Sequence, residues 1–123
     1  MVMWNRNQEV DYQPRVCGGD WCFMTELART PAEQQLGLMN RESMEEGDGM
    51  LFIFEGSEFH NFWMKNTLIP LDMIWIDDQF KVVKIITAQP CTAEPCMIYN
   101  PQKLATYVLE INAGMAEKHG IVE

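Results

Sequence analysis

The sequence predicts a single α+β domain, a small, partly closed antiparallel β-barrel or sheet with two short helices packed outside. Short apolar runs typical of strands recur along the chain, whereas only two segments carry helix signals. The connections between these runs are too short for the crossovers that parallel strands need, so we expect no βαβ units. A length of 123 residues suits one compact domain. We expect a poorly ordered polar arm at residues 1–19 and the globular domain at residues 20–123.

Six segments are predicted strands. Residues 50–54 and 71–76 are apolar at almost every position, which is typical of a strand covered on both faces. The other four predicted strands are residues 21–28, 59–65, 80–86 and 104–112.

The first predicted helix has a clear start signal. Thr30 is a capping residue, Pro31 takes the first helical position, and Glu33 follows the cap by three residues. We expect this helix to run to about Met39. A second short helix is predicted at residues 113–119, before Gly120.

The charge balance excludes one large class of partner. Eighteen acidic residues face nine basic ones, for a net charge of -9, so the chain is a poor nucleic-acid binder. No apolar run approaches the ~18 residues that span a bilayer, and the first residues lack the apolar core of a secretory signal. Two readings remain: a cytosolic protein, or a mature one whose leader was removed.

The cysteines favour the second reading. Cys17 and Cys22, like Cys91 and Cys96, are separated by four residues that include turn formers, so each pair can close a local disulfide in an oxidising compartment. Four cysteines allow three pairings, and a four-thiolate zinc site is the competing interpretation. We favour disulfides and expect no metal site.

Ten methionines raise the possibility of a soft-metal protein, because thioethers suit Cu(I). A copper site needs several methionines at short spacing, whereas these are spread along the chain within apolar segments. We therefore favour core packing. Eight of the ten carry this interpretation: Met24, Met39, Met44, Met50, Met64, Met73, Met97 and Met115.

Four stretches, TPAEQQLGLMNR, GMLFIF, FWMKNTLIPLDMIWID and YVLEINAG, occur in this order. Together they closely resemble the domain-of-unknown-function 192 family of bacteria and archaea, over roughly residues 24–121. The resemblance implies a small α+β, barrel-like domain, commonly found behind a signal peptide or lipid anchor. It implies no activity or ligand, so it assigns no catalytic residue.

The segment FWMKNTLIPLD concentrates polar groups in an apolar setting, and it holds our main candidate site. Asp72 lies in an otherwise apolar strand and needs a partner, for which Lys65 is a reasonable choice. Lys65, Asn66 and Asp72 beside Trp63 could orient a ligand. The structural alternative, which we favour, makes Asp72 a turn-stabilising acceptor and Lys65 a surface cation.

Two further charged residues are weaker candidates. Glu110 lies on the strand face opposite Tyr107, Leu109 and Ile111, and could join Asp72 as an acid–base pair, although a solvated face is favoured. Arg41 could bind an anion, but we favour an anchor to Glu45 or Asp48. His60 and His119 are expected to be structural or surface residues.

The chain lacks the short motifs of nucleophilic, nucleotide-binding and metal-dependent enzymes, so we expect no cofactor. The sequence favours a non-catalytic binding or accessory module of the cell envelope, outside the cytoplasm. Its partner would be a small molecule, a glycan or an envelope protein. The alternatives are a small hydrolytic or other enzyme using Lys65 and Asp72, with Glu110, and a soft-metal binding protein.

Overall fold

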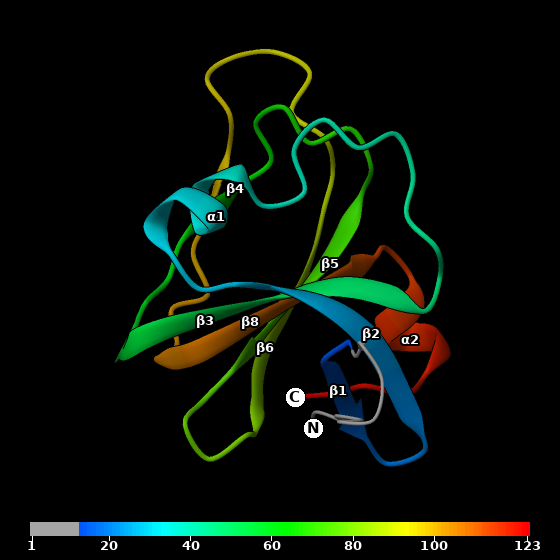
Figure 1. Ribbon diagram of the computed structural model, residues 1–123. Helices are drawn as coiled ribbons and strands as arrows, with labels where there is room; N and C mark the ends of the chain where they lie inside the picture. Colours follow the sequence, from blue (N-terminus) through cyan, green and yellow to red (C-terminus); the bar gives the residue numbers. More distant parts are fainter. Residues whose placement is uncertain (1–12) are drawn as a thin grey trace, which may run out of the picture.

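The computed structural model describes residues 13–123, and residues 1–12 of the expected arm lie outside the described part. Six strands form one open sheet in the order β1-β2-β3-β8-β5-β6, and β4 pairs with β7 in a separate ribbon (Figure 1). The strands are β1 (Arg15–Gly18), β2 (Trp21–Ala28), β3 (Asp48–Glu58), β4 (Phe62–Trp63), β5 (Leu71–Ile76), β6 (Val82–Ala88), β7 (Ile98–Tyr99) and β8 (Ala105–Asn112).

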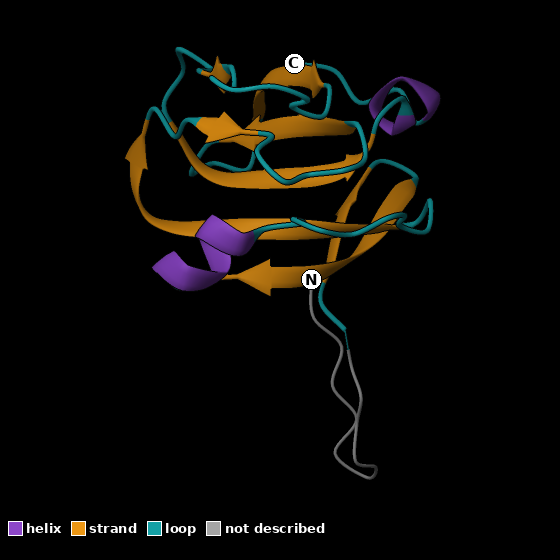
Figure 2. Ribbon diagram, turned by 90° about the horizontal axis from the view of Figure 1, so that it is seen from above, coloured by secondary structure: helices purple, strands orange, loops and turns teal. Residues whose placement is uncertain are grey.

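The two short helices lie on opposite sides of the strands (Figure 2). They are α1 (Pro31–Leu36) and α2 (Met115–Lys118), so the α+β class, with mostly β structure, is confirmed. The sheet is not closed, and the expectation of a partly closed barrel is not confirmed.

The β2–β3 pair corrects the all-antiparallel expectation. β2 and β3 run parallel, with Glu26 opposite Met50 and Ala28 opposite Phe52. Residues 29–47, which include α1, make the crossover between them and are long enough for it. The expected antiparallel pairing was therefore wrong here, because α1 and the loop of residues 37–47 together are long enough for a crossover.

The N-terminal end of α1 agrees with the sequence prediction. Thr30 accepts a hydrogen bond from the Glu33 backbone N–H, and the Glu33 carboxylate accepts from the Thr30 N–H, each at 3.1 Å. The helix ends at Leu36, earlier than expected, because Gly37 adopts a φ of 49° that breaks the helical path. Residues 37–39 are thereby free to turn over the sheet.

Other element boundaries differ in ways that have local causes. Residues 15–18, which we expected in the arm, form β1 because they pair with residues 21–24 in a hairpin. The strand expected at residues 59–65 contracts to Phe62–Trp63, which pairs only with β7. The buried strand Leu71–Ile76 is confirmed, with all six residues buried.

Both faces of the central strands are covered, and each face has its own apolar cluster. Met73 and Trp75 of β5 belong to the cluster beneath α1 and β4, whereas Ile74 and Ile76 face the cluster that includes Ala116 of α2. The first cluster also holds Met50 and Met64, so core packing is confirmed for these methionines. Trp75 donates its indole N–H to the His60 carbonyl at 2.8 Å, which ties the segment before β4 to the sheet.

Gly49 allows the close approach of β3 to β8. A Cβ at this position would lie 2.6 Å from the Glu110 carbonyl oxygen, well inside contact distance. The absence of a side chain lets the two backbones pair here, with Gly49 opposite Ile111. This pairing fixes Glu110 next to it, in the middle of the sheet.

Candidate functional site

Glu110 is the acidic residue that the fold places most unusually. It lies in the central strand β8, between Met50 of β3 and Met73 of β5, and is 4% exposed. The solvated face expected for Glu110 was therefore wrong: its side chain points toward the cluster beneath α1. Alternation along β8 was read correctly, but the sequence did not show that α1 and β4 cover this face.

Burial controls the chemistry of this carboxyl group. Desolvation raises the pKa of Glu110 to about 8, because the apolar surroundings disfavour the charged form. Among residues 13–123, no hydrogen bond to the Glu110 carboxyl group contributes to this shift, and burial is its one cause. Glu110 is consequently mostly protonated at pH 7 and half ionised near pH 8.

A cavity of about 260 Å³ opens above Glu110, and we call it the Glu110 cavity. Its walls come from α1 and the turn after it, from the end of β3, and from the segment around β4. The lining residues are Gln34, Gln35, Leu36, Gly37, Leu38, Met39, Phe54, His60, Asn61, Phe62, Trp63, Thr67 and Glu110.

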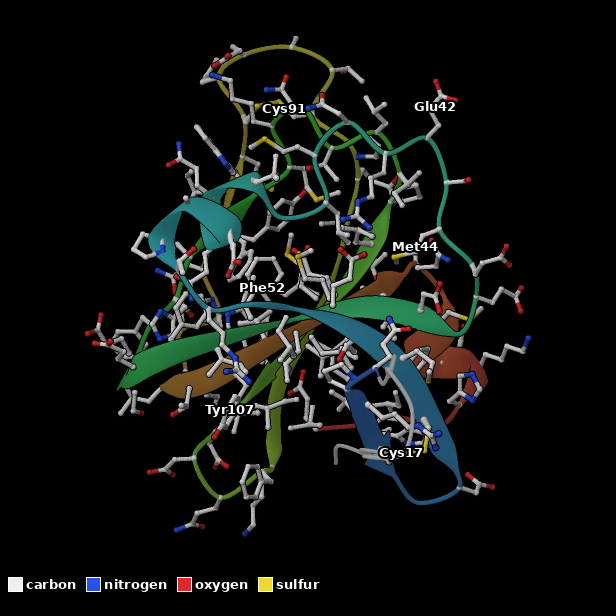
Figure 3. All side chains as sticks on the ribbon, in the orientation of Figure 1. Cys17, Glu42, Met44, Phe52, Cys91 and Tyr107 are labelled. Atoms are coloured by element: carbon white, nitrogen blue, oxygen red, sulfur yellow. A yellow bond between two sulfur atoms is a disulfide. The ribbon has the colours of Figure 1, made fainter. Side chains whose placement is uncertain are left out.

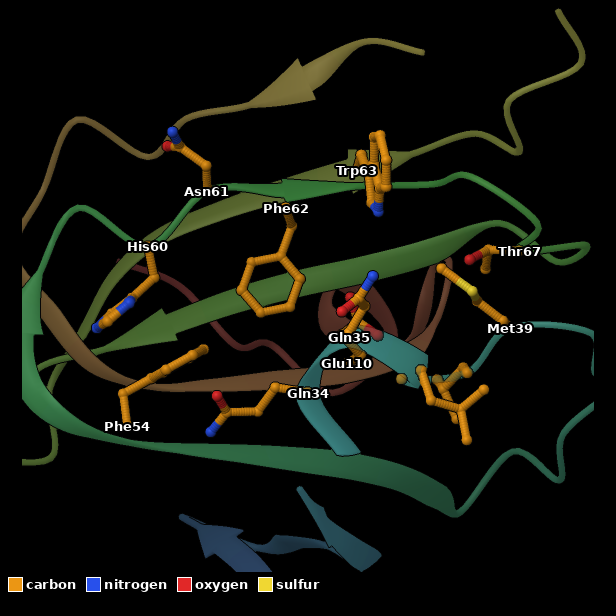
Figure 4. Close-up of a pocket in the computed structure, with 13 residues that line it drawn as sticks. Gln34, Gln35, Met39, Phe54, His60, Asn61, Phe62, Trp63, Thr67 and Glu110 are labelled. Atoms are coloured by element: carbon orange, nitrogen blue, oxygen red, sulfur yellow. The ribbon is translucent and has the colours of Figure 1, made fainter. Parts of the chain in front are cut away.

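Figure 4 shows how these side chains are arranged. Gln35 and Glu110 overlap at the centre of the view. Phe62 lies on one side of them, and Met39 and Thr67 lie on the other. The cavity therefore combines an apolar body with a few polar groups, as small-molecule sites usually do.

Several polar side chains around the cavity already donate their hydrogens to the backbone. Gln34 donates its amide nitrogen to the Ile53 carbonyl at 2.8 Å and to the Ala28 carbonyl at 3.3 Å. The Thr67 hydroxyl donates to the Lys65 carbonyl at 3.3 Å. Their remaining capacity is to accept hydrogen bonds.

The His60 side chain also donates a hydrogen bond to a backbone carbonyl. Its Nε2 lies 3.0 Å from the Gly56 carbonyl oxygen, which can only accept, so Nε2 carries the hydrogen. In the neutral imidazole, Nδ1 is then an acceptor. The ring also stacks on Phe54, with 3.8 Å between centroids. The structural role expected for His60 is confirmed, and the residue additionally lines the cavity.

Asp72 and Lys65 do not form the predicted pair. The Asp72 carboxylate accepts hydrogen bonds from the Thr87 hydroxyl at 2.6 Å and from the backbone N–H groups of Gly114 and Ala116 at 3.0 and 2.9 Å. Asp72 is thus a buried structural acceptor, as the structural alternative held. The partner was wrong because residues 113–116 return to β5 only in the tertiary fold.

Lys65 instead lies at the surface. Its Nζ is 3.2 Å from Glu94 and 5.3 Å from the centre of the Trp63 ring. Lys65 therefore links Trp63 to the loop of residues 88–102. Trp63 lines the Glu110 cavity, so of the expected cluster only Trp63 reaches it, and it meets Glu110 there.

Asn66 and Arg41 also have structural positions. Asn66 has a φ of 56°, and its carbonyl accepts from the Asn40 N–H at 2.8 Å, which joins the turn before β5 to the turn after α1. Arg41 binds Glu26 through two hydrogen bonds, one of them 2.8 Å long. The expected anchor to Glu45 or Asp48 was wrong, because the parallel β2–β3 pairing brings Glu26 to this loop.

The cysteines form two local disulfides, Cys17–Cys22 and Cys91–Cys96. The pairs lie at opposite ends of the molecule (Figure 3), so the four sulfurs do not form one zinc site. Cys17–Cys22 closes the β1–β2 hairpin. Cys91–Cys96 closes the loop that carries Glu94.

Sequence reasoning missed Gln34, Gln35 and Thr67 as cavity residues. Both glutamines belong to the helix signal, and nothing local shows that their helix lies above Glu110. The one available signal was the isolated glutamate within the apolar run of β8.

The family profile of DUF192, described as "Uncharacterized ACR", matches residues 16–123, and the chain belongs to this family. Two solved structures share its fold. A "putative transcription regulator" from Sinorhizobium meliloti 1021 is 36% identical, with a TM-score of 0.76 over 82% of this chain and 77% of that chain. A protein of unknown function from Novosphingobium aromaticivorans is 38% identical, with a TM-score of 0.77 over 83% and 71%. No curated protein matches the sequence.

Proposed function

We propose that this DUF192 domain is a non-catalytic binding module that holds a small organic molecule in the Glu110 cavity. The observation that carries the proposal is a buried carboxyl group at the floor of a cavity, without a hydrogen-bond partner in residues 13–123. An unpaired buried polar group costs stability, and a ligand that bonds to it would offset that cost. A volume of about 260 Å³ suits a small ligand.

We further propose that the domain works outside the cytoplasm, as an accessory module of the cell envelope. Two disulfides in a chain of this size favour an oxidising compartment. Among residues 13–123, no helix is long and apolar enough to cross a membrane. The net charge of -9 opposes phosphate-backbone binding, so we do not extend the regulator label of the Sinorhizobium protein to this chain.

A proton-transfer enzyme is the second candidate, because a carboxyl group with a pKa of about 8 can donate and accept protons near neutrality. The predicted catalytic set loses support, however. Lys65 and Asp72 bond to other groups and do not line the cavity. We therefore favour binding over catalysis.

A thermal-shift screen with sugars, amines and cell-wall fragments tests the binding function. A ligand present at a hundred times its dissociation constant should stabilise the domain by about 2.7 kcal/mol. Gln35→Trp should fill the cavity and abolish the shift, whereas Ala32→Trp, on the same helix but outside the cavity, should keep it. Ligand shifts that survive Gln35→Trp would contradict the proposed site, and chemical conversion of the ligand would favour the enzyme.

A further inference from the structure

Three side chains that line the Glu110 cavity have already used their hydrogen-bond donors. Gln34, Thr67 and His60 each direct a hydrogen toward a backbone carbonyl, as described above, so the hydrogen-bonding capacity left on each of these side chains is to accept. Ionised Glu110 is an acceptor only. Gln35 and Asn61 each carry both a carbonyl acceptor and an amide donor, and Trp63 carries an indole N–H donor, so a ligand that also has an acceptor could bond to them.

The charges around the cavity favour a cationic ligand over an anionic one. Among the described residues, no Lys or Arg lines it. The chain as a whole carries a net charge of -9, so its long-range field attracts cations. An anionic ligand would meet no counter-charge here, and burying it beside Glu110 would be strongly unfavourable.

The walls suit the apolar part of an amine. Phe54, Phe62 and Trp63 line the cavity, and aromatic faces attract cations as well as apolar groups. Lys65 lies over the Trp63 ring and binds Glu94, and it is not among the residues that line the cavity. An organic ammonium with a compact apolar body would use both the aromatic walls and the acceptors.

We propose that the Glu110 cavity binds a protonated primary amine, with the Glu110 carboxylate as the counter-ion of its ammonium group. This inference rests on the proposed binding function and names its ligand class. The ammonium N–H groups would bond to Glu110 and to the acceptors of Gln34 and Thr67. Glu110 that is protonated before binding releases its proton to the buffer, so one charge pair forms and one proton leaves.

Benzylammonium and its neutral analogue, benzyl alcohol, provide a matched pair of probes. We expect benzylammonium to bind at least tenfold more tightly at pH 8, because a charge-assisted hydrogen bond is stronger than a neutral one. Benzyltrimethylammonium keeps the charge but has no N–H, and we expect it to bind more weakly than benzylammonium. Benzoate should not bind. Titrations followed by ¹⁵N NMR report the affinities and show whether Phe62 and Thr67 shift.

The pH dependence gives a second readout. With a Glu110 pKa of about 8, the ionised fraction rises roughly 15-fold from pH 6.5 to pH 8, and benzylammonium affinity should rise with it. Calorimetry in two buffers of different ionisation enthalpy should show proton release at pH 7. His60 is the one other titratable residue that lines the cavity in residues 13–123. The remaining carboxylates on the elements around Glu110 lie outside the lining; they are Glu33, Asp48, Glu55, Glu58 and Asp72.

Glu110→Gln keeps the shape of the side chain and removes its charge. It should lower benzylammonium affinity at least tenfold, leave benzyl alcohol unchanged and abolish proton release. Glu42→Gln, an exposed control with the same charge change, should alter none of these. Equal or tighter binding of benzyl alcohol to the unmodified protein overturns the amine inference and leaves the binding function standing. If neither these probes nor any screened compound shifts the NMR resonances of the cavity residues, both the amine inference and the proposed binding function are contradicted.

Discussion

The Asp72 carboxylate accepts a 2.9 Å hydrogen bond from the backbone N–H of Ala116, 44 residues further along the chain. Ala116 lies in the first turn of α2, whose N–H groups lack partners within the helix. A second bond from Gly114 and a third from Thr87 complete the coordination of the carboxylate. Asp72 therefore holds α2 against the sheet from inside the core.

Replacement of Asp72 by Ala should destabilise the domain by about 3 kcal/mol, because two backbone N–H groups and one hydroxyl lose their acceptor. Urea unfolding followed by tryptophan fluorescence measures the change. Asp78→Ala, in the exposed β5–β6 turn, is the control and should stay within about 0.5 kcal/mol of the unmodified protein. A similar small effect for Asp72→Ala would contradict the structural role.

The stability of the domain should fall as the pH rises toward 8. The pKa of Glu110 is raised in the folded state, so the folded protein retains a proton that the unfolded chain has lost. Its stabilising contribution is complete below the ordinary glutamate pKa and is lost as the pH rises through about 8. Between pH 5 and 7.5 the free energy of unfolding should decrease by about 1.4 kcal/mol per pH unit.

Urea unfolding at intervals of half a pH unit checks this slope. Glu110→Gln does not titrate, so its stability should be nearly flat over the same range. A slope that persists unchanged in Glu110→Gln would assign the pH dependence to other groups. The test needs no ligand and is independent of the amine inference.

The Arg41–Glu26 pair should contribute modestly, since both side chains are partly exposed. A double-mutant cycle with Arg41→Ala and Glu26→Ala should give a coupling of about 0.5–1 kcal/mol that weakens in 1 M salt. The Arg41 hydrogen bond lowers the pKa of Glu26, so this contribution is present above the ordinary glutamate pKa and lost as the pH falls through the lowered value. Zero coupling at low salt would contradict it.

Removal of the two disulfides should affect different parts of the structure. Each closes a short loop, so removal of either pair by Cys→Ala substitutions should cost about 2 kcal/mol. Removal of Cys91–Cys96 should also speed amide hydrogen exchange at Phe62 and Trp63, because β4 pairs with β7 next to this loop. Removal of Cys17–Cys22 should leave exchange there unchanged, and equal effects from both pairs would refute the distinction.

Local signals predicted much of the fold. The capping residues around Thr30, the buried run of β5 and the alternation in β8 each depend on neighbours in sequence, and each prediction is confirmed. The parallel β2–β3 pair and the open sheet depend on contacts between distant segments. Periodicity carries no information about these, so the strand order could not be derived from it.

The candidate site shows the same division. Asp72 was recognised as a buried carboxylate that needs partners, but its partners come from residues 87, 114 and 116. Glu110 was placed on the correct face of its strand, yet that face is buried by α1 and β4. The chemical needs of a single residue could be predicted from the sequence, whereas the groups that surround it could be identified only from the tertiary structure.

The position of β8 has a consequence for how the domain forms. This strand lies between β3 and β5 in the sheet but follows both of them in the sequence, so the two halves of the sheet join only when residues 105–112 are in place. Until then, β3 and β5 each lack the neighbour that covers one edge. The central pairing of the sheet, and with it the floor of the cavity, therefore depends on contacts between segments far apart in the sequence, which is the kind of contact that closes slowly.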